Sequence, residues 1–182
     1  MRIFIALDIP EEIRARMREY MERARSYAPD ARWARVEGLH VTLKFVGETG
    51  DAAVQQIKTA LAGVKAAPFA VKFEGVGFFP NPKAARVFWI GVNGDEALPQ
   101  LAAAIDKELE KLGIARDEKH YYPHLTMARA SSHPLRELAP LVTAHAPPQQ
   151  FGTMTAREFF LYRSQPQEGG SKYTRLERFA LE

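Results

Sequence analysis

The stretch Leu39-His40-Val41-Thr42-Leu43-Lys44-Phe45-Val46 alternates between two kinds of side chain at every second position. Such a period of two predicts a β-strand whose two faces differ in polarity. We expect one face to enter the core, with Leu39, Val41, Leu43 and Phe45, and the other to carry His40, Thr42, Lys44 and Val46. A second stretch, Pro123-His124-Leu125-Thr126-Met127, repeats the His-x-Thr order. Each of two strands thus presents an imidazole and a hydroxyl on one face.

The hydrophobic periodicity outward from these strands predicts hairpins mixed with helices. We expect further strands at Arg2–Leu7, Arg32–Val36, Phe69–Phe79, Arg86–Val92, Thr155–Arg163 and Lys172–Phe179, with a loop at Gln165–Ser171 between the last two. We expect helices from Pro10 through the stripe Ile13, Met17, Met21 and Ala24, at Asp51–Lys65, at Glu96–Leu112 and, shorter, around Leu135–Ala144. This order favours an α+β fold with antiparallel sheets. Because each half holds a helix followed by a His-x-Thr strand, we expect two similar lobes around a shared groove, in one bilobal domain over residues 1–182.

The composition restricts the chemistry that is available. The chain has 182 residues, 46% of them hydrophobic, a formal net charge of +3 and no cysteine. Disulfides, thiolate metal sites and a cysteine nucleophile are therefore excluded. No apolar run reaches the ~18 residues that span a bilayer, and Asp8 interrupts the short apolar start, which we interpret as a strand rather than a signal peptide. We expect a cytoplasmic monomer that contacts no membrane.

Two histidines and two threonines on facing strands suit a phosphodiester. Displacement at phosphorus needs a base for the attacking water and an acid for the leaving oxygen, and two histidines can fill both roles near neutral pH. Threonine hydroxyls can donate to the non-bridging oxygens, so the reaction needs no metal. Lys44 continues the His40 face and either meets a phosphate or lies exposed at a sheet edge. Strict alternation points Arg129 away from the groove.

Other sites are less well supported by the sequence. His120 and His124 have the spacing of a helical zinc pair, but Pro123 argues against a helix there. We expect His133 and His145 to be surface histidines. Helix faces that carry only charges are expected in solvent, and two are present: Arg14, Arg16, Arg18, Arg23 and Arg25 on the first helix, and Asp106, Glu108 and Glu110 on the third. Nucleotide-binding glycine loops and the G-x-S-x-G elbow of serine hydrolases are missing.

At these residues the chain resembles the two-histidine phosphoesterase superfamily, and in particular its RNA 2′,3′-cyclic phosphodiesterase branch, once known as bacterial 2′-5′ RNA ligases. The resemblance covers nearly the whole chain, through segments that occur in the family's order. These are Arg2–Leu7, Trp33–Gly47, the hairpin Phe78–Trp89, His124–Arg129 and Leu161–Tyr173.

The resemblance implies hydrolysis of an RNA-terminal 2′,3′-cyclic phosphate to a 2′-phosphate, in a cleft between two lobes and without metal or nucleotide cofactor. It implies that His40 donates a proton to the departing 3′ oxygen and that His124 is the base that activates water. Thr42 and Thr126 would hold the phosphate. Arg129 would assist them, which requires a bulge or bend in its strand.

Several alternatives stay open at this stage. A related enzyme could cleave a 2′-5′ linkage or a small cyclic nucleotide, and the reverse reaction would join RNA ends. A non-catalytic protein could bind RNA ends in the same groove. The aromatic residue that stacks on a base is one of four candidates: Phe4, Phe45, Tyr122 and Tyr173.

Overall fold

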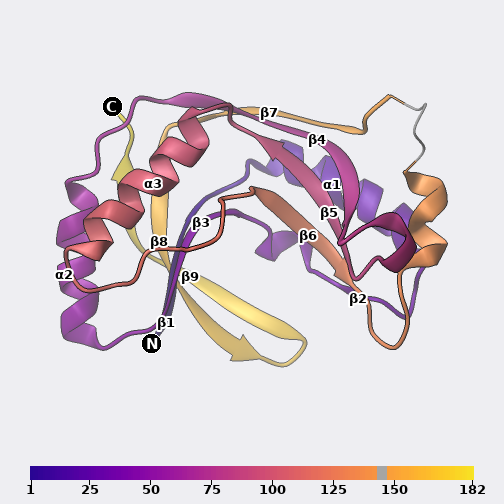
Figure 1. Ribbon diagram of the computed structural model, residues 1–182, viewed down its shortest axis with the longest axis horizontal. Coiled ribbons are helices and arrows are strands. Elements are labelled where there is room, and N and C mark those ends of the chain that lie inside the picture. The colour runs from indigo at the N-terminus through magenta and orange to yellow at the C-terminus, as the bar shows by residue number, and fades with distance from the viewer. Residues whose placement is uncertain (143–146) are drawn as a thin grey trace.

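The computed structural model describes residues 1–142 and 147–182 as two antiparallel sheets with helices beside them (Figure 1). The first sheet has the order β3 (Val41–Glu48), β1 (Arg2–Leu7), β8 (Glu158–Gln167) and β9 (Gly170–Ala180). The second has the order β2 (Arg32–Trp33), β6 (His124–Arg129), β5 (Val87–Asn93), β4 (Phe69–Phe79) and β7 (Gln150–Ala156). The predicted α+β class with antiparallel sheets is confirmed.

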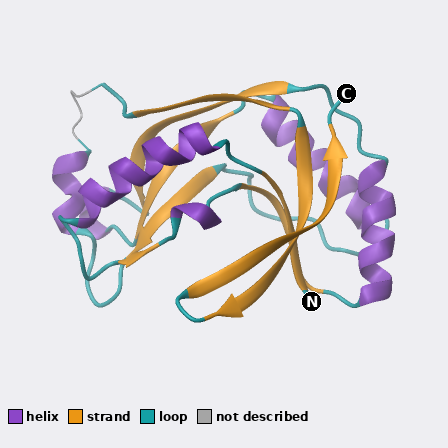
Figure 2. Cartoon of the chain, turned by 180° about the vertical axis from the view of Figure 1, so that it is seen from behind, coloured by secondary structure: helices purple, strands orange, loops and turns teal. Residues whose placement is uncertain are grey.

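Within these residues, three α-helices connect and cover the sheets, as Figures 1 and 2 show from opposite sides. They are α1 (Glu11–Arg25), α2 (Asp51–Ala62) and α3 (Ala97–Glu110), and short 3-10 helices lie at Val36–Gly38 (η1), Pro82–Ala84 (η2) and Arg136–Leu141 (η3). Helix α1 follows a strand of the first sheet but packs against β7 of the second, whereas α3 follows β5 of the second sheet and packs against β3 of the first. Because the helices are exchanged in this way, one apolar core runs through both sheets.

Some element boundaries differ from the sequence-based expectation. The strand expected at Arg32–Val36 stops at Trp33 and is followed by η1. The loop expected at Gln165–Ser171 is mostly strand, because β8 and β9 continue to a two-residue turn in which Gly169 takes a positive φ of 76°. The strand expected at Thr155–Arg163 is the end of β7 and most of β8, with Arg157 between them.

The short helix expected around Leu135–Ala144 is the 3-10 helix η3 as far as Leu141. Thr143 and Ala144, at the end of that expected helix, lie outside the described residues, as does His145. No helix in the described part of the chain is both long and apolar enough to cross a bilayer.

A β-bulge in β3 changes which face its side chains take. Along the β1–β3 pair, Ile5 lies opposite Lys44 and Ala6 opposite Thr42, so Leu43 is an extra residue. Lys44 therefore turns into the interior, where it is 2% exposed, and Phe45 turns outward, where it is 65% exposed. The expectation that Phe45 would lie in the core and Lys44 on the polar face is wrong for this reason, while Leu39, Val41 and Leu43 are buried as predicted.

Candidate active site

A cavity of about 670 Å³ lies between the two sheets and joins both His-x-Thr motifs. Its walls include His40 and Thr42 at the start of β3 and His124 and Thr126 on β6. The third wall is the segment 116–122, which connects α3 to β6. The structure thus brings together the four side chains that the sequence predicts to share a groove.

Arg129 also lines this cavity, although strict alternation predicts that it points away. The reason is a second bulge: Phe88 lies opposite Ala128 and Trp89 opposite Thr126, so Met127 is an extra residue in β6. Beyond the bulge the alternation is shifted by one position, which returns Arg129 to the face of Thr126. The prediction that Arg129 points away from the groove is therefore wrong, and the bend that the family resemblance requires is present.

His124 is held in one orientation by its neighbours. Its Nδ1 donates a hydrogen bond of 2.8 Å to the carbonyl oxygen of Tyr122. A neutral imidazole that donates through Nδ1 has its lone pair on Nε2. The Phe79 ring packs edge-on against His124, with 5.1 Å between ring centroids. His124 is therefore set to accept a proton at Nε2.

His40 lies against an aromatic floor formed by the cleft-side residues of the first sheet. Its ring stacks on Phe4 at 4.7 Å and meets the edge of Tyr173 at 5.0 Å. Burial, and to a smaller extent the positive charge of Arg14, lowers the pKa of His40 to about 4, against the opposing effects of Asp8 and of a hydrogen bond with the backbone of Gly38. His40 is thus neutral at pH 7 in the free protein.

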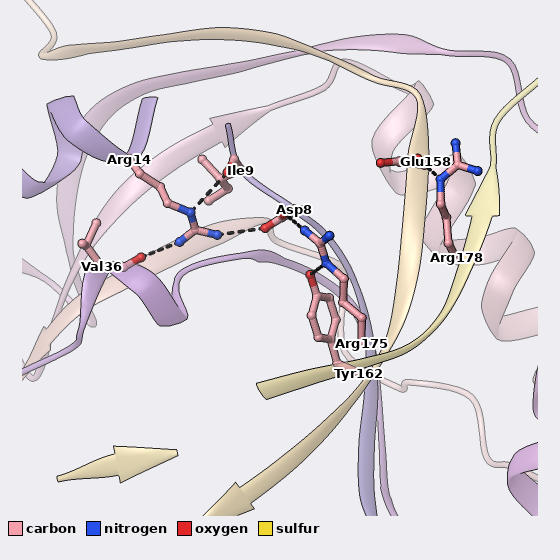
Figure 3. Close-up of polar contacts among 8 residues, drawn as sticks. All are labelled: Asp8, Ile9, Arg14, Val36, Glu158, Tyr162, Arg175 and Arg178. Atoms are coloured by element: carbon pink, nitrogen blue, oxygen red, sulfur yellow. Dashed lines mark hydrogen bonds and ion pairs between the residues drawn. The ribbon is translucent and has the colours of Figure 1, made fainter. Parts of the chain in front are cut away.

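An ion-pair network lines a neighbouring cavity wall together with His40 and acts on the charge of His40, and Figure 3 shows Asp8 of this network between two guanidinium groups. One Asp8 oxygen accepts from Arg14 at 2.9 Å, and the other pairs with Arg175. Arg14 also donates to the carbonyl oxygens of Ile9 and of Val36, the latter at 2.5 Å. Arg14 is only 11% exposed, so the prediction that it belongs to a solvated arginine face is wrong.

Lys44 lines the cavity but is buried, so the expectation of an exposed lysine at a sheet edge is wrong. Its Nζ pairs with Asp106 of α3 at 2.6 Å and with Asp117 at 3.0 Å, and it donates to the carbonyl oxygen of Ala115 at 2.8 Å. Asp106 is only 17% exposed, so the prediction that it belongs to a solvated acidic face is wrong. These contacts fasten the start of the cavity's third wall to β3.

A second contact fastens the end of the same wall. Tyr121 donates its hydroxyl proton to the carbonyl oxygen of Thr42 at 2.9 Å. Because Tyr121 is only three residues before His124, this bond links the backbone of one motif to the approach of the other. Sequence reasoning misses this link, since nothing in the spacing of Tyr121 and Thr42 indicates it.

The remaining histidines fall into three cases. His120 lines the cavity, but the chain around it is not helical, which confirms the expectation drawn from Pro123. His133 is a surface histidine as predicted, 52% exposed and paired with Glu137 at 2.9 Å. His145 lies outside the described residues.

The four aromatic residues that are candidates for stacking on a base differ in their exposure and in their position relative to the cavity. Phe4 is 2% exposed and belongs to the floor beneath His40. Phe45 and Tyr122 line the cavity and are 65% and 56% exposed. Tyr173, 38% exposed, lies at the far side of His40.

Comparisons with known proteins agree with this geometry. The family described as LigT like phosphoesterase matches residues 7–89. A protein of Archaeoglobus fulgidus named RNA 2′,3′-cyclic phosphodiesterase is 37% identical over 98% of this chain and 99% of its own length. The crystal structure of TT0787 of Thermus thermophilus superposes with a TM-score of 0.79 at 30% identity, covering 100% of this chain and 98% of that one. E. coli LigT complexed with 3′-AMP gives a TM-score of 0.80 at 27% identity, covering 99% and 97% of the two chains.

Proposed function

Because the chain belongs to the family of LigT-like phosphoesterases, we propose that it hydrolyses RNA-terminal 2′,3′-cyclic phosphate to a 2′-phosphate. The observation that carries the proposal is the single cavity that receives both motifs. Relatives that align over nearly the whole chain bear the name of this activity. The bound 3′-AMP of E. coli LigT supports a nucleotide as the kind of ligand that such a cleft accepts.

In the proposed mechanism each histidine moves one proton. His124 takes a proton from water through Nε2, and the water oxygen forms a bond to phosphorus. The bond from phosphorus to the 3′ oxygen breaks in line with this attack, and His40 protonates the departing oxygen. The hydroxyls of Thr42 and Thr126, with the charge of Arg129, stabilise the non-bridging oxygens as negative charge builds up on them.

The low pKa of His40 constrains its role as the acid. A neutral His40 is too weak an acid to protonate the leaving oxygen, so in this proposal the negative charge of the bound phosphodiester raises the pKa of His40. The Nδ1 bond to Tyr122 supports the complementary role of His124, since it leaves Nε2 free to act as the base.

The roles can be tested with a leaving group that needs no proton. A nucleoside p-nitrophenyl phosphate releases p-nitrophenolate, which departs without an acid. We expect His40→Ala to lose about 10²–10⁴-fold on the cyclic substrate but far less on the p-nitrophenyl ester. His124→Ala should lose activity on both. If the p-nitrophenyl ester instead rescues His124→Ala, the two roles are reversed.

We propose that the whole chain acts as a single domain and as a monomer in the cytoplasm, without metal. The continuous core through both sheets supports one domain, and one chain supplies both motifs to the cavity. RNA as the substrate favours the cytoplasm. Gel filtration with light scattering tests the monomer, and turnover that is unchanged by EDTA tests independence from metal.

The deciding experiment incubates the protein and EDTA with an oligonucleotide that ends in 2′,3′-cyclic phosphate, then identifies the product. We expect a 2′-phosphate. Binding without turnover would identify a non-catalytic RNA-end-binding protein. Exclusive cleavage of a 2′-5′ linkage would identify the related activity, and formation of a 2′-5′ bond from added 5′-hydroxyl RNA would show that ligation also occurs.

A further inference from the structure

A second cavity, of about 550 Å³, lies beside the first and shares His40 with it. It is lined by the Asp8–Arg14–Arg175 network and by Lys172, Tyr173 and Thr174 of β9. None of these network or β9 residues lines the first cavity. One imidazole therefore separates the phosphate cleft from a neighbouring site on the β8–β9 hairpin.

The charges around this second cavity favour an anion. Three cations line it, Arg14, Lys172 and Arg175, against two carboxylates. Asp8 is shared between Arg14 and Arg175, and Glu37 lies 3.5 Å from Arg18, which is outside the cavity. Positive charge remains in excess on the cavity wall.

Two of the cations are accessible. Arg175 is 54% exposed and lies over the Phe160 ring, which together with Asp8 holds its guanidinium in place. Lys172 is exposed and forms no ion pair with any residue of 1–142 or 147–182. Lys172 and Arg175 both line the cavity, and an exposed ammonium and a fixed guanidinium are groups that bind phosphate oxygens.

The side on which the leaving oxygen departs indicates which phosphate of the RNA would reach this cavity. The inference rests on the proposed function, in which His40 protonates the 3′ oxygen. That oxygen belongs to the terminal ribose, and the ribose carries the rest of the RNA strand through its 5′ oxygen. Because water attacks from the opposite side, the strand leaves the cleft on the side of His40.

We infer that the second cavity binds the phosphodiester that joins the terminal nucleotide to its 5′ neighbour, through Lys172 and Arg175. Tyr173, edge-on to His40 and partly exposed on the same wall, lies where the neighbouring base can stack on it. The enzyme then has two subsites and prefers the cyclic phosphate at the end of an RNA strand to an isolated cyclic nucleotide.

The test compares kcat/KM for a dinucleotide and a mononucleotide that both end in 2′,3′-cyclic phosphate, at low salt. We expect the wild-type protein to favour the dinucleotide more than tenfold, and this ratio to fall as salt rises. A dinucleotide of the same bases joined by an uncharged methylphosphonate should lose most of the preference. Lys172→Gln and Arg175→Gln should each lower the ratio about five- to tenfold. The control Lys65→Gln removes an exposed charge that lines neither cavity, and should keep the wild-type ratio.

The ratio of kcat/KM for the dinucleotide to that for the mononucleotide tests the second subsite separately from the activity itself. Turnover of both substrates with equal kcat/KM overturns the second subsite and leaves the activity standing, whereas no turnover of either substrate overturns the activity. If the methylphosphonate dinucleotide keeps the full preference, the cavity does not recognise the phosphate charge. A wild-type ratio in both Lys172→Gln and Arg175→Gln rejects these residues as its ligands.

Discussion

Replacing His40 by glutamine should remove a large part of the acid sensitivity of the fold. The pKa of His40 is lowered from 6.5 to about 4 in the folded chain, chiefly by burial. Between these two values the unfolded chain binds more protons than the folded chain, so stability is lost as pH falls through this window. When the pH falls from 7 to 5, this difference in the pKa of His40 between the unfolded and the folded chain lowers the free energy of unfolding by about 2 kcal/mol.

Urea unfolding of the wild-type protein and of His40→Gln at the two pH values measures this contribution. The loss of unfolding free energy from pH 7 to pH 5 should be smaller in the variant by about 2 kcal/mol. An NMR titration of the His40 ring gives an independent midpoint, which should lie near 4 and should rise when inorganic phosphate is added. Equal pH dependence in the two proteins, together with an imidazole midpoint near 6.5, would refute the reasoning.

Three further substitutions test the walls of the cleft. Lys44→Ala leaves the mostly buried carboxylate of Asp106 without its partner and should lower the free energy of unfolding by about 3 kcal/mol. Asp106→Asn in the same chain should restore part of this loss in urea unfolding, and a loss below about 1 kcal/mol would contradict a structural role. Arg129→Ala should lower kcat/KM about tenfold or more because a charged contact to phosphate is lost, with partial rescue in Arg129→Lys, while an unchanged rate would show that this arginine does not reach the substrate. Phe45→Ala removes a ring that is 65% exposed and should change the melting temperature little; a large decrease would mean that the ring has a packing role.

The sequence indicates most of the fold because its long elements have clear periods. Helices α1, α2 and α3 bury apolar residues at helical spacing, and every end of the two hairpin strands β4 and β5 is predicted to within one residue. The two His-x-Thr motifs are equally readable, because a strand places residues two apart on the same face.

The parts that sequence reasoning misses depend on single-residue irregularities. A bulge inserts one residue and reverses every later inside and outside assignment in its strand, yet it changes no local propensity. This is why alternation assigns Phe45, Lys44 and Arg129 to the wrong face. The burial of Arg14 is missed for a different reason, since its partners Asp8 and Val36 are brought to it only by the tertiary fold.

The wall that is fastened to β3 by Lys44 and Tyr121 also has a thermodynamic consequence for ligand binding. This wall leads directly into His124, so the spacing between the two imidazoles is set when the chain folds. The entropy lost in ordering the cleft is then already lost before a ligand arrives. A five-membered cyclic phosphate has few internal rotations of its own to lose. Binding of the cyclic phosphate to the cleft should therefore carry a small entropic penalty. A ligand that is not cyclic has more rotations to restrict and should bind with a larger entropic penalty.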